Sequence, residues 1–147
     1  MLAPTPTQYQ RLEEMARIWK KHQGGDALRG AAGANPRLDV DALCFQVHAL
    51  EGNDAPTLLV GALISPVSLS LVMAPLFGSD AAPTAGAQQT FKLPSGSYPF
   101  IAEVLEEGVW LWRCELLDDL SDVDSREEGS RLAQRLMDKV MTPSDTA

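Results

Sequence analysis

The sequence has few of the residues that metal binding and nucleophilic catalysis most often require. Its 147 residues include only 2 Cys and 2 His. Cys44 and His48 fall on one predicted strand, where four residues span about 13 Å, too far for both to ligate one ion. A nucleophile also needs a neighbouring base, and no Gly-x-Ser-x-Gly motif occurs. We therefore expect no metal, no cofactor and no catalytic residues, with Cys44 and Cys114 as free thiols.

The sequence also lacks an excess of basic residues and a long uninterrupted apolar segment. There are 12 Lys and Arg against 20 Asp and Glu, a net charge of -8, which argues against nucleic-acid binding. Residues 55–79 contain Pro56, Pro66 and Pro75, so they predict strands rather than a membrane-spanning helix. The first residues lack the pattern of a secretory signal. We expect a cytoplasmic protein with no nucleic-acid partner and no stable membrane insertion.

The sequence does contain a strongly acidic middle. Residues 38–124 carry thirteen acidic and two basic residues, whereas residues 1–37 carry three acidic and six basic ones. The density is highest over residues 103–124, with eight acids and one base, Arg113. Such a run usually keeps a protein soluble, and it would also attract a basic peptide. We interpret these carboxylates as a solvated surface rather than as a catalytic acid and base. The candidate partner-binding acids are Glu106, Glu107, Asp118 and Asp119.

Two amphipathic helices are predicted, one near each end of the chain. The first covers residues 8–22 and begins with a capping box of Thr7 and Gln10. The second follows a capping box of Ser125 and Glu128. Its apolar face contains Leu132, Ala133, Leu136, Met137 and Val140.

Between the helices the sequence predicts a loop over residues 27–36, followed by strands joined by turns. The predicted strands are residues 38–45, 57–64, 67–75, 98–105 and 109–116. The first two form one hairpin across a turn at residues 51–54, and the last two form another. Residues 67–75 alternate apolar residues with serine, which indicates a strand with one wet face. We expect residues 78–90 to form a mobile loop, because they contain almost no large apolar side chain.

These elements predict a single α+β domain over residues 1–147. A mostly antiparallel sheet would carry the N-terminal and C-terminal helices packed on it. No internal repeat and no break in composition requires a second domain. We expect the ends, residues 1–7 and 142–147, to be flexible.

Trp110 and Trp112 share one face of the last predicted strand, whereas Val109 and Leu111 share the other. The ordinary interpretation is a pair of core aromatics, because aromatic residues are common in buried strands. The alternative is an anchor for a partner protein, because tryptophan dominates many interface cores. Both tryptophans are therefore candidate partner-binding residues.

Five short motifs follow one another along the sequence. They are Asn35-Pro36-Arg37-Leu38-Asp39-Val40-Asp41-Ala42, Gly61-Ala62-Leu63-Ile64-Ser65-Pro66, Leu71-Val72-Met73-Ala74-Pro75, Pro94-Ser95-Gly96-Ser97-Tyr98-Pro99-Phe100 and Leu111-Trp112-Arg113-Cys114-Glu115-Leu116. In this order and spacing they resemble the HybE-type (HupJ-type) assembly chaperones of nickel–iron hydrogenases. The resemblance covers roughly residues 10–140, and its weight lies in the order of the motifs.

The resemblance implies a non-enzymatic cytoplasmic chaperone whose protein client is the hydrogenase small-subunit precursor, near its twin-arginine signal peptide. The chain departs from the family after Pro66, where Val67-Ser68-Leu69-Ser70 stands in place of Trp-Phe-Met-Asn. Pro66 and Leu69 at this corner join the candidate partner-binding residues. The rubredoxin-like extension of some relatives is absent, so the resemblance implies no iron site.

Other functions compete with this one. The residues favour a mechanism in which an acidic surface attracts a basic segment while a groove beside the sheet holds apolar side chains. A secretion-type chaperone or an adaptor that binds another basic or amphipathic client would use the same chemistry. A small-molecule enzyme would have to depend on Cys114, Asp118 and Asp119, and we expect changes at these residues to leave the function intact.

Overall fold

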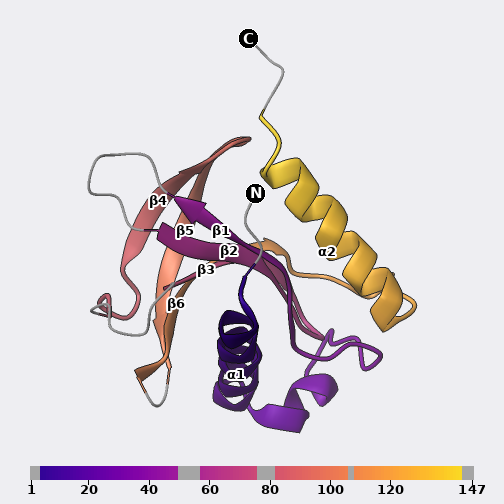
Figure 1. Cartoon of the computed structure of the whole chain (residues 1–147). Coiled ribbons are helices and arrows are strands. Elements are labelled where there is room, and N and C mark those ends of the chain that lie inside the picture. The colour runs from indigo at the N-terminus through magenta and orange to yellow at the C-terminus, as the bar shows by residue number, and fades with distance from the viewer. Residues whose placement is uncertain (1–3, 50–56, 76–81, 106–107, 144–147) are drawn as a thin grey trace.

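Six strands and two α-helices make up most of the chain (Figure 1). The structure, a computed structural model, describes residues 4–49, 57–75, 82–105 and 108–143. In chain order the elements are α1 (Pro6–His22), the 3-10 helix η1 (Gly25–Gly30), β1 (Asp41–Ala49), β2 (Thr57–Ile64), β3 (Leu69–Pro75), β4 (Gln88–Leu93), β5 (Gly96–Val104), β6 (Trp110–Leu117) and α2 (Arg126–Val140). No helix in the described part of the chain has the length and apolar character that crossing a membrane requires.

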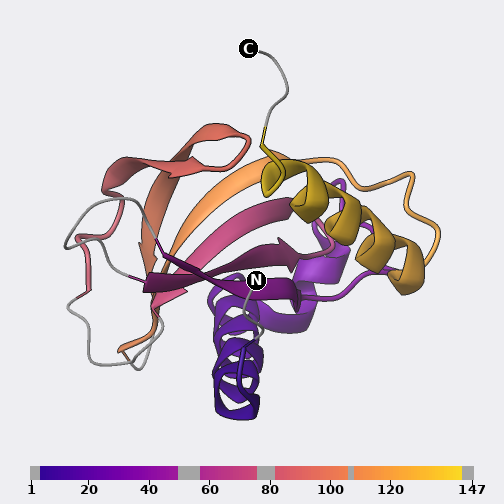
Figure 2. The same cartoon turned by 45° about the horizontal axis from the view of Figure 1, so that its top comes forward.

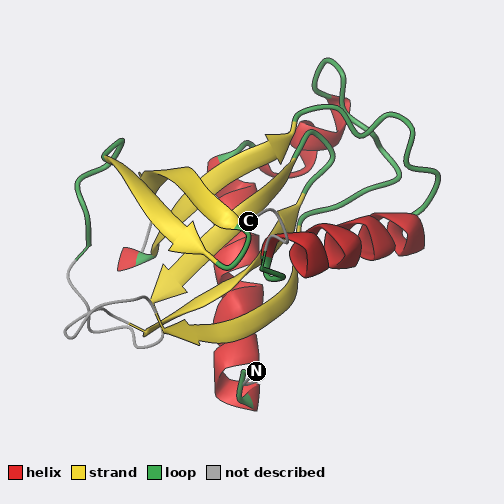
Figure 3. Ribbon diagram, turned by 90° about the horizontal axis from the view of Figure 1, so that it is seen from above, coloured by secondary structure: helices red, strands yellow, loops and turns green. Residues whose placement is uncertain are grey.

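The strands form one antiparallel sheet in the order β1-β2-β3-β6-β5-β4. Figure 2 shows α1 on one face of this sheet and α2 on the other. Seen from above, α1 passes beneath the strands while α2 lies to one side (Figure 3). The predicted α+β class and both predicted hairpins are confirmed, since β1 pairs with β2 and β5 with β6. The turn predicted at residues 51–54 lies outside the described residues.

Each face of the sheet has its own apolar core. The α1-side cluster includes Leu12, Met15, Ile18, Trp19, Phe45, Leu59, Leu63, Val72 and Leu111. The α2-side cluster includes Leu58, Val60, Leu69, Leu71, Met73, Phe91, Phe100, Trp110, Trp112, Ala133 and Met137. Because both faces are covered at the centre of the sheet, β3 is buried on both sides, and the wet face predicted for residues 67–75 is wrong. Ser70 does not face water there, since its hydroxyl accepts a hydrogen bond from Arg113.

The first helix begins two residues earlier than predicted. Thr5 is the N-cap, and its hydroxyl accepts a hydrogen bond from the backbone N–H of Gln8 while the Gln8 side chain accepts one from Thr5. Pro6 fits the first helical position, because proline has no N–H to leave unpaired and its φ already suits a helix. The helix therefore includes Pro6 and Thr7, which were expected to be flexible. Part of the loop predicted over residues 27–36 forms the 3-10 helix η1.

A β-bulge in β1 moves its apolar side chains from one face of the sheet to the other. The register with β2 shifts between Leu43 and Gln46, and Cys44 has a positive φ of 60°. The bulge places Phe45 in the α1-side cluster, directly over Gly61. A Cβ atom at Gly61 would lie 2.3 Å from the Phe45 ring, so only glycine fits beneath it. The strand predicted over residues 38–45 therefore begins only at Asp41, and it extends to Ala49.

The edge strand β4 was not predicted. It begins at Gln88, inside the range of residues 78–90 that was expected to be a loop. Phe91 and Leu93 are buried, and the Phe91 ring makes edge contacts with Phe100 and Trp112 at 5.4 Å between ring centroids. Pairing with β5 orders this segment, which its own composition could not do.

The C-terminal helix forms as predicted, with half of the predicted capping box. The Ser125 hydroxyl accepts a hydrogen bond from the Glu128 N–H at 3.1 Å. The Glu128 carboxylate instead accepts one from the Asp124 N–H at 3.0 Å. At the other end, the Ser95 N–H donates to the Val140 carbonyl at 3.0 Å, which joins the β4–β5 turn to α2.

The buried side chain of Asn35 joins three segments that are far apart in the sequence. Its amide nitrogen donates to the carbonyls of Leu120 and Val123, both at 2.8 Å, and its oxygen accepts from the Arg37 N–H at 3.0 Å. Its backbone N–H donates to the Pro66 carbonyl at 2.7 Å. The entry to β1, the β2–β3 turn and the β6–α2 loop therefore meet at this residue.

A carboxylate at the edge of the sheet links the two helices. One oxygen of Asp39 lies 2.9 Å from the Lys20 ammonium in α1, and the other lies 3.4 Å from the Arg126 guanidinium at the start of α2. Nearby, burial raises the pKa of Asp41, while Arg126 lowers it and the negative charge of Asp39 raises it further. The pKa of Asp41 is thus higher in the folded state than in the unfolded state. The free energy of unfolding therefore falls as pH rises through the range between these two pKa values.

Replacing Asn35 removes three hydrogen bonds from a buried site. We expect Asn35→Ala to lower the free energy of unfolding by about 3 kcal/mol, because the carbonyls of Leu120 and Val123 lose their donor. For a domain of this size that is a fall in Tm of roughly 6–12 °C, measurable by circular dichroism. The exposed Gln89→Ala is the matched control. A Tm for Asn35→Ala within about 2 °C of the parent would contradict the role given to the amide.

Neutralising Asp41 should stabilise the protein at neutral pH and not in acid. We expect Asp41→Asn to raise Tm by about 1 °C at pH 7, where the parent carboxylate is ionised, with a smaller difference at pH 4. The shift is small because solvent screens this partly exposed group. Asp122→Asn, on an exposed loop, controls for the change in net charge. A Tm that falls at pH 7 would show that the attraction between Asp41 and Arg126 outweighs the cost of burial.

Candidate functional site

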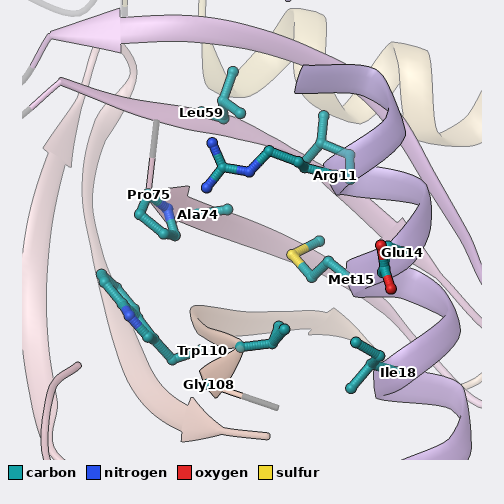
Figure 4. A pocket seen from close by; sticks show the side chains of 11 residues that line it. Arg11, Glu14, Met15, Ile18, Leu59, Ala74, Pro75, Gly108 and Trp110 are labelled. Carbon is teal, nitrogen blue, oxygen red and sulfur yellow. The ribbon is translucent and has the colours of Figure 1, made fainter. Parts of the chain in front are cut away.

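A groove lies between the N-terminal half of α1 and the ends of three central strands (Figure 4). Its volume is about 360 Å³. α1 forms one wall, and the residues just before β6 and at its start form the opposite wall. The ends of β2 and β3 form the floor between them. The lining residues are Arg11, Leu12, Glu14, Met15, Ile18, Leu59, Ala74, Pro75, Gly108, Val109 and Trp110.

The groove has an apolar lining, with charged side chains of α1 at one rim. Met15, Ile18 and Leu59 are apolar side chains of the α1-side cluster, and Glu14 at the rim forms an ion pair with Arg17 at 2.9 Å. The volume is more than twice that of a cavity of about 150 Å³ that holds a benzene molecule. The groove is therefore large enough for two or three apolar side chains of another polypeptide.

A chain of polar contacts runs beside the groove. The Trp19 indole N–H donates to one carboxylate oxygen of Glu103 at 3.0 Å, and Arg113 donates to the other at 2.5 Å. Arg113 also donates to the Ser70 hydroxyl at 2.7 Å, and its guanidinium lies 5.5 Å from the centre of the Trp19 ring. These contacts connect α1, β5, β6 and β3.

The two candidate tryptophans have different positions. Both belong to the α2-side cluster, as expected for residues that share one strand face, and both are only 9% exposed. Trp112 packs against Phe91, which fits the interpretation as a core aromatic. Trp110 is also one of the residues that line the groove.

Pro66 and Leu69 are buried beside the β2–β3 turn. The Leu69 side chain packs in the α2-side cluster, and neither residue offers exposed surface. The turn is held by Ser65, whose hydroxyl accepts hydrogen bonds from the backbone N–H groups of Val67 and Ser68. Partner contact at Pro66 and Leu69 stays a prediction, and their observed contacts are structural.

The two candidate acids that the structure describes, Asp118 and Asp119, lie away from the groove. Asp118 and Asp119 are exposed and follow β6, whereas Glu106 and Glu107 precede it and lie outside the described residues. The eight residues of β6 separate Asp118 from the groove by about 26 Å. The Ser121 N–H donates to Asp119 at 3.0 Å and lowers the pKa of that carboxyl, so Asp119 stays ionised.

Neither thiol has an imidazole among the groups that shift its pKa, and the side chain of His48 lies outside the described residues. Burial raises the pKa of the Cys44 thiol, and the charge of Asp138 raises it further. Burial also raises the pKa of the buried Cys114 thiol, against an opposing effect of Arg113. His22 is exposed at the end of α1. The described residues contain no group of three or more side chains placed to hold a metal ion.

The groove could not be found from the sequence. The apolar stripe of α1 was recognised as a helix face that packs on the sheet, which is also true. No local pattern shows that the same stripe also lines a groove at the ends of β2 and β3. Leu59, Ala74 and Val109 lie far apart in sequence, and only the sheet order brings them together.

Comparison with known proteins identifies the class of protein. A protein-family model described as NiFe-hydrogenase assembly, chaperone, HybE matches residues 10–147. Because this match covers most of the chain, the protein belongs to the HybE family of hydrogenase assembly chaperones. The family predicted from the five motifs is thus confirmed.

One solved structure is similar to the chain, the solution structure of HybE from Escherichia coli. The two sequences are 24% identical, with a TM-score of 0.49. The similarity covers 67% of this chain and 60% of the chain of that structure, so it spans less than two thirds of that protein's length. No curated protein matches.

Proposed function

We propose that the protein is a non-enzymatic cytoplasmic chaperone that binds the precursor of a nickel–iron hydrogenase small subunit at or near its twin-arginine signal peptide. Membership of the HybE family supports an assembly role. The observation that carries the proposal is the apolar groove beside α1, which has the size and chemistry to hold side chains of an apolar segment. The apolar part of the signal peptide is its occupant.

The expected affinity suits a chaperone that must release its client. Burying two or three apolar side chains contributes about 2 kcal/mol each. Loss of translational and rotational freedom on association offsets much of that gain. The groove alone therefore supports weak binding, of the order of millimolar. Weak binding allows the precursor to leave once its assembly is complete.

The acidic segment after β6 contributes by attracting the basic part of the client. Asp118, Asp119, Asp122 and Asp124 are all exposed, and α2 begins with the exposed Glu127 and Glu128. An extended peptide needs about eight residues to reach this segment from the groove. Charge attraction at that distance acts mainly on the rate of association.

Filling the groove should weaken binding of the client. We expect Ala74→Phe to weaken binding of a synthetic signal peptide at least tenfold by isothermal titration calorimetry, because the new ring occupies the space of one client side chain. Gln89→Phe, on the exposed face of β4, should bind like the parent. A peptide whose apolar residues are replaced by serine should not bind. Unchanged affinity of Ala74→Phe, or equal binding of an unrelated basic peptide, would contradict the proposal and favour a general adaptor.

Removing acidic charge should slow capture of the client. We expect the double variant Asp118→Asn, Asp119→Asn to lower the association rate constant by about threefold at low salt and to flatten its dependence on ionic strength. Stopped-flow fluorescence with a labelled signal peptide measures both. Glu13→Gln plus Asp138→Asn, at exposed positions of α1 and α2, changes the net charge equally and tests whether position matters. Identical salt dependence in all three proteins would show that these acids only keep the protein soluble.

A further inference from the structure

We propose that Glu103 is the positioning residue that sets the width of the groove, by holding Trp19 of α1. The inference rests on the proposed function only in taking the groove as the client site. Glu103 does not line the groove, and its effect on a client would pass entirely through α1. No feature of the sequence singled out this residue, apart from its place in the acidic middle.

The hydrogen bond between Trp19 and Glu103 joins the two walls of the groove. Trp19 belongs to α1, the first wall, and directly follows the lining residue Ile18. Glu103 belongs to β5, which pairs with β6, and its register partner is Leu111, next to the lining residue Trp110. The 3.0 Å bond therefore fixes the separation between α1 and the β5–β6 hairpin.

The same contacts also fix both walls to the floor. Arg113 holds the second oxygen of Glu103 and donates to Ser70 of β3, the strand that ends in Ala74 and Pro75. Trp19 is 2% exposed, so its hydrogen bond to a carboxylate lies in a poorly hydrated environment, where such bonds are strong. Glu103 and Arg113 together thus connect all three sides of the groove.

The contact holds α1 at Trp19, on the C-terminal side of the residues that line the groove. The C-terminal half has a second attachment, the ion pair of Lys20 with Asp39 at 2.9 Å. The lining residue Arg11 is eight residues from Trp19, a distance of about 12 Å along the helix. A rotation of about 10° at Trp19 would move that end by about 2 Å. That displacement is comparable to a methyl group and changes which side chains the groove accepts.

The test measures the width directly, without any ligand. In a Cys44→Ser background, nitroxide labels at Gln10→Cys in α1 and Val104→Cys in β5 report their separation by pulsed electron spin resonance. We expect Trp19→Phe and Glu103→Leu to broaden the distance distribution and shift its mean by about 2 Å or more. Glu103→Gln keeps an oxygen that accepts from the indole, so it should largely restore the parent distribution. Signal-peptide affinity should follow the same order, with about a tenfold loss in Trp19→Phe.

Phe91→Leu is the control for general loss of stability. It alters the opposite face of the sheet, so it should lower Tm and leave the distance distribution unchanged. A parent-like distribution in Trp19→Phe and in Glu103→Leu would overturn the inference, as would equal broadening in Phe91→Leu. A broadened distribution in a protein that binds no signal peptide would support the role of Glu103 and count against the proposed function instead. If Glu103→Leu does not fold, Trp19→Phe and Glu103→Gln decide the outcome alone.

Discussion

The side-chain amide of Asn35 makes the contacts on which the arrangement of the two helices depends. It binds carbonyls of the β6–α2 loop while its backbone binds the β2–β3 turn. The segment that connects α1 to β1 is thereby hydrogen-bonded to the loop that connects β6 to α2. Two of the five family motifs, those that contain Asn35 and Pro66, meet at this point. The motifs that carried the resemblance therefore include residues that hold the fold together, and they account for the fold more directly than for client binding.

The proposed client groove follows from how the sheet is covered. A central strand such as β3 needs an apolar layer on each face, and α1 and α2 supply these layers. Met15 and Ile18 of α1 belong to the core on their side of the sheet and also line the groove at the ends of β2 and β3. The contact of Trp19 with Glu103 comes directly after Ile18, the last of the α1 residues that line the groove.

Elements with a strong local pattern were predictable. The continuous apolar run of β2 and the apolar stripe of α2, which recurs at helical spacing, each predicted an element where the structure has it. β4 was missed because its alternation consists of Phe91 and Leu93 alone, and its order comes from pairing with β5. The prediction that one face of β3 is exposed was wrong, because a serine can be buried when a neighbour such as Arg113 donates a hydrogen bond to its hydroxyl. Among the candidate site residues, Trp110 lines the groove. The groove itself depends on where neighbouring strands end relative to one another, which no local pattern in the sequence shows.

The central claim is that the groove beside α1 holds the client, and a hydrogen–deuterium exchange footprint tests it most directly. The chaperone is compared alone and bound to a hydrogenase small-subunit precursor. The account predicts slower exchange in the peptides that contain Met15, Ile18 and Val109, with β4 unchanged. Protection confined to the acidic segment after β6, with exchange in α1 unaltered, would contradict it.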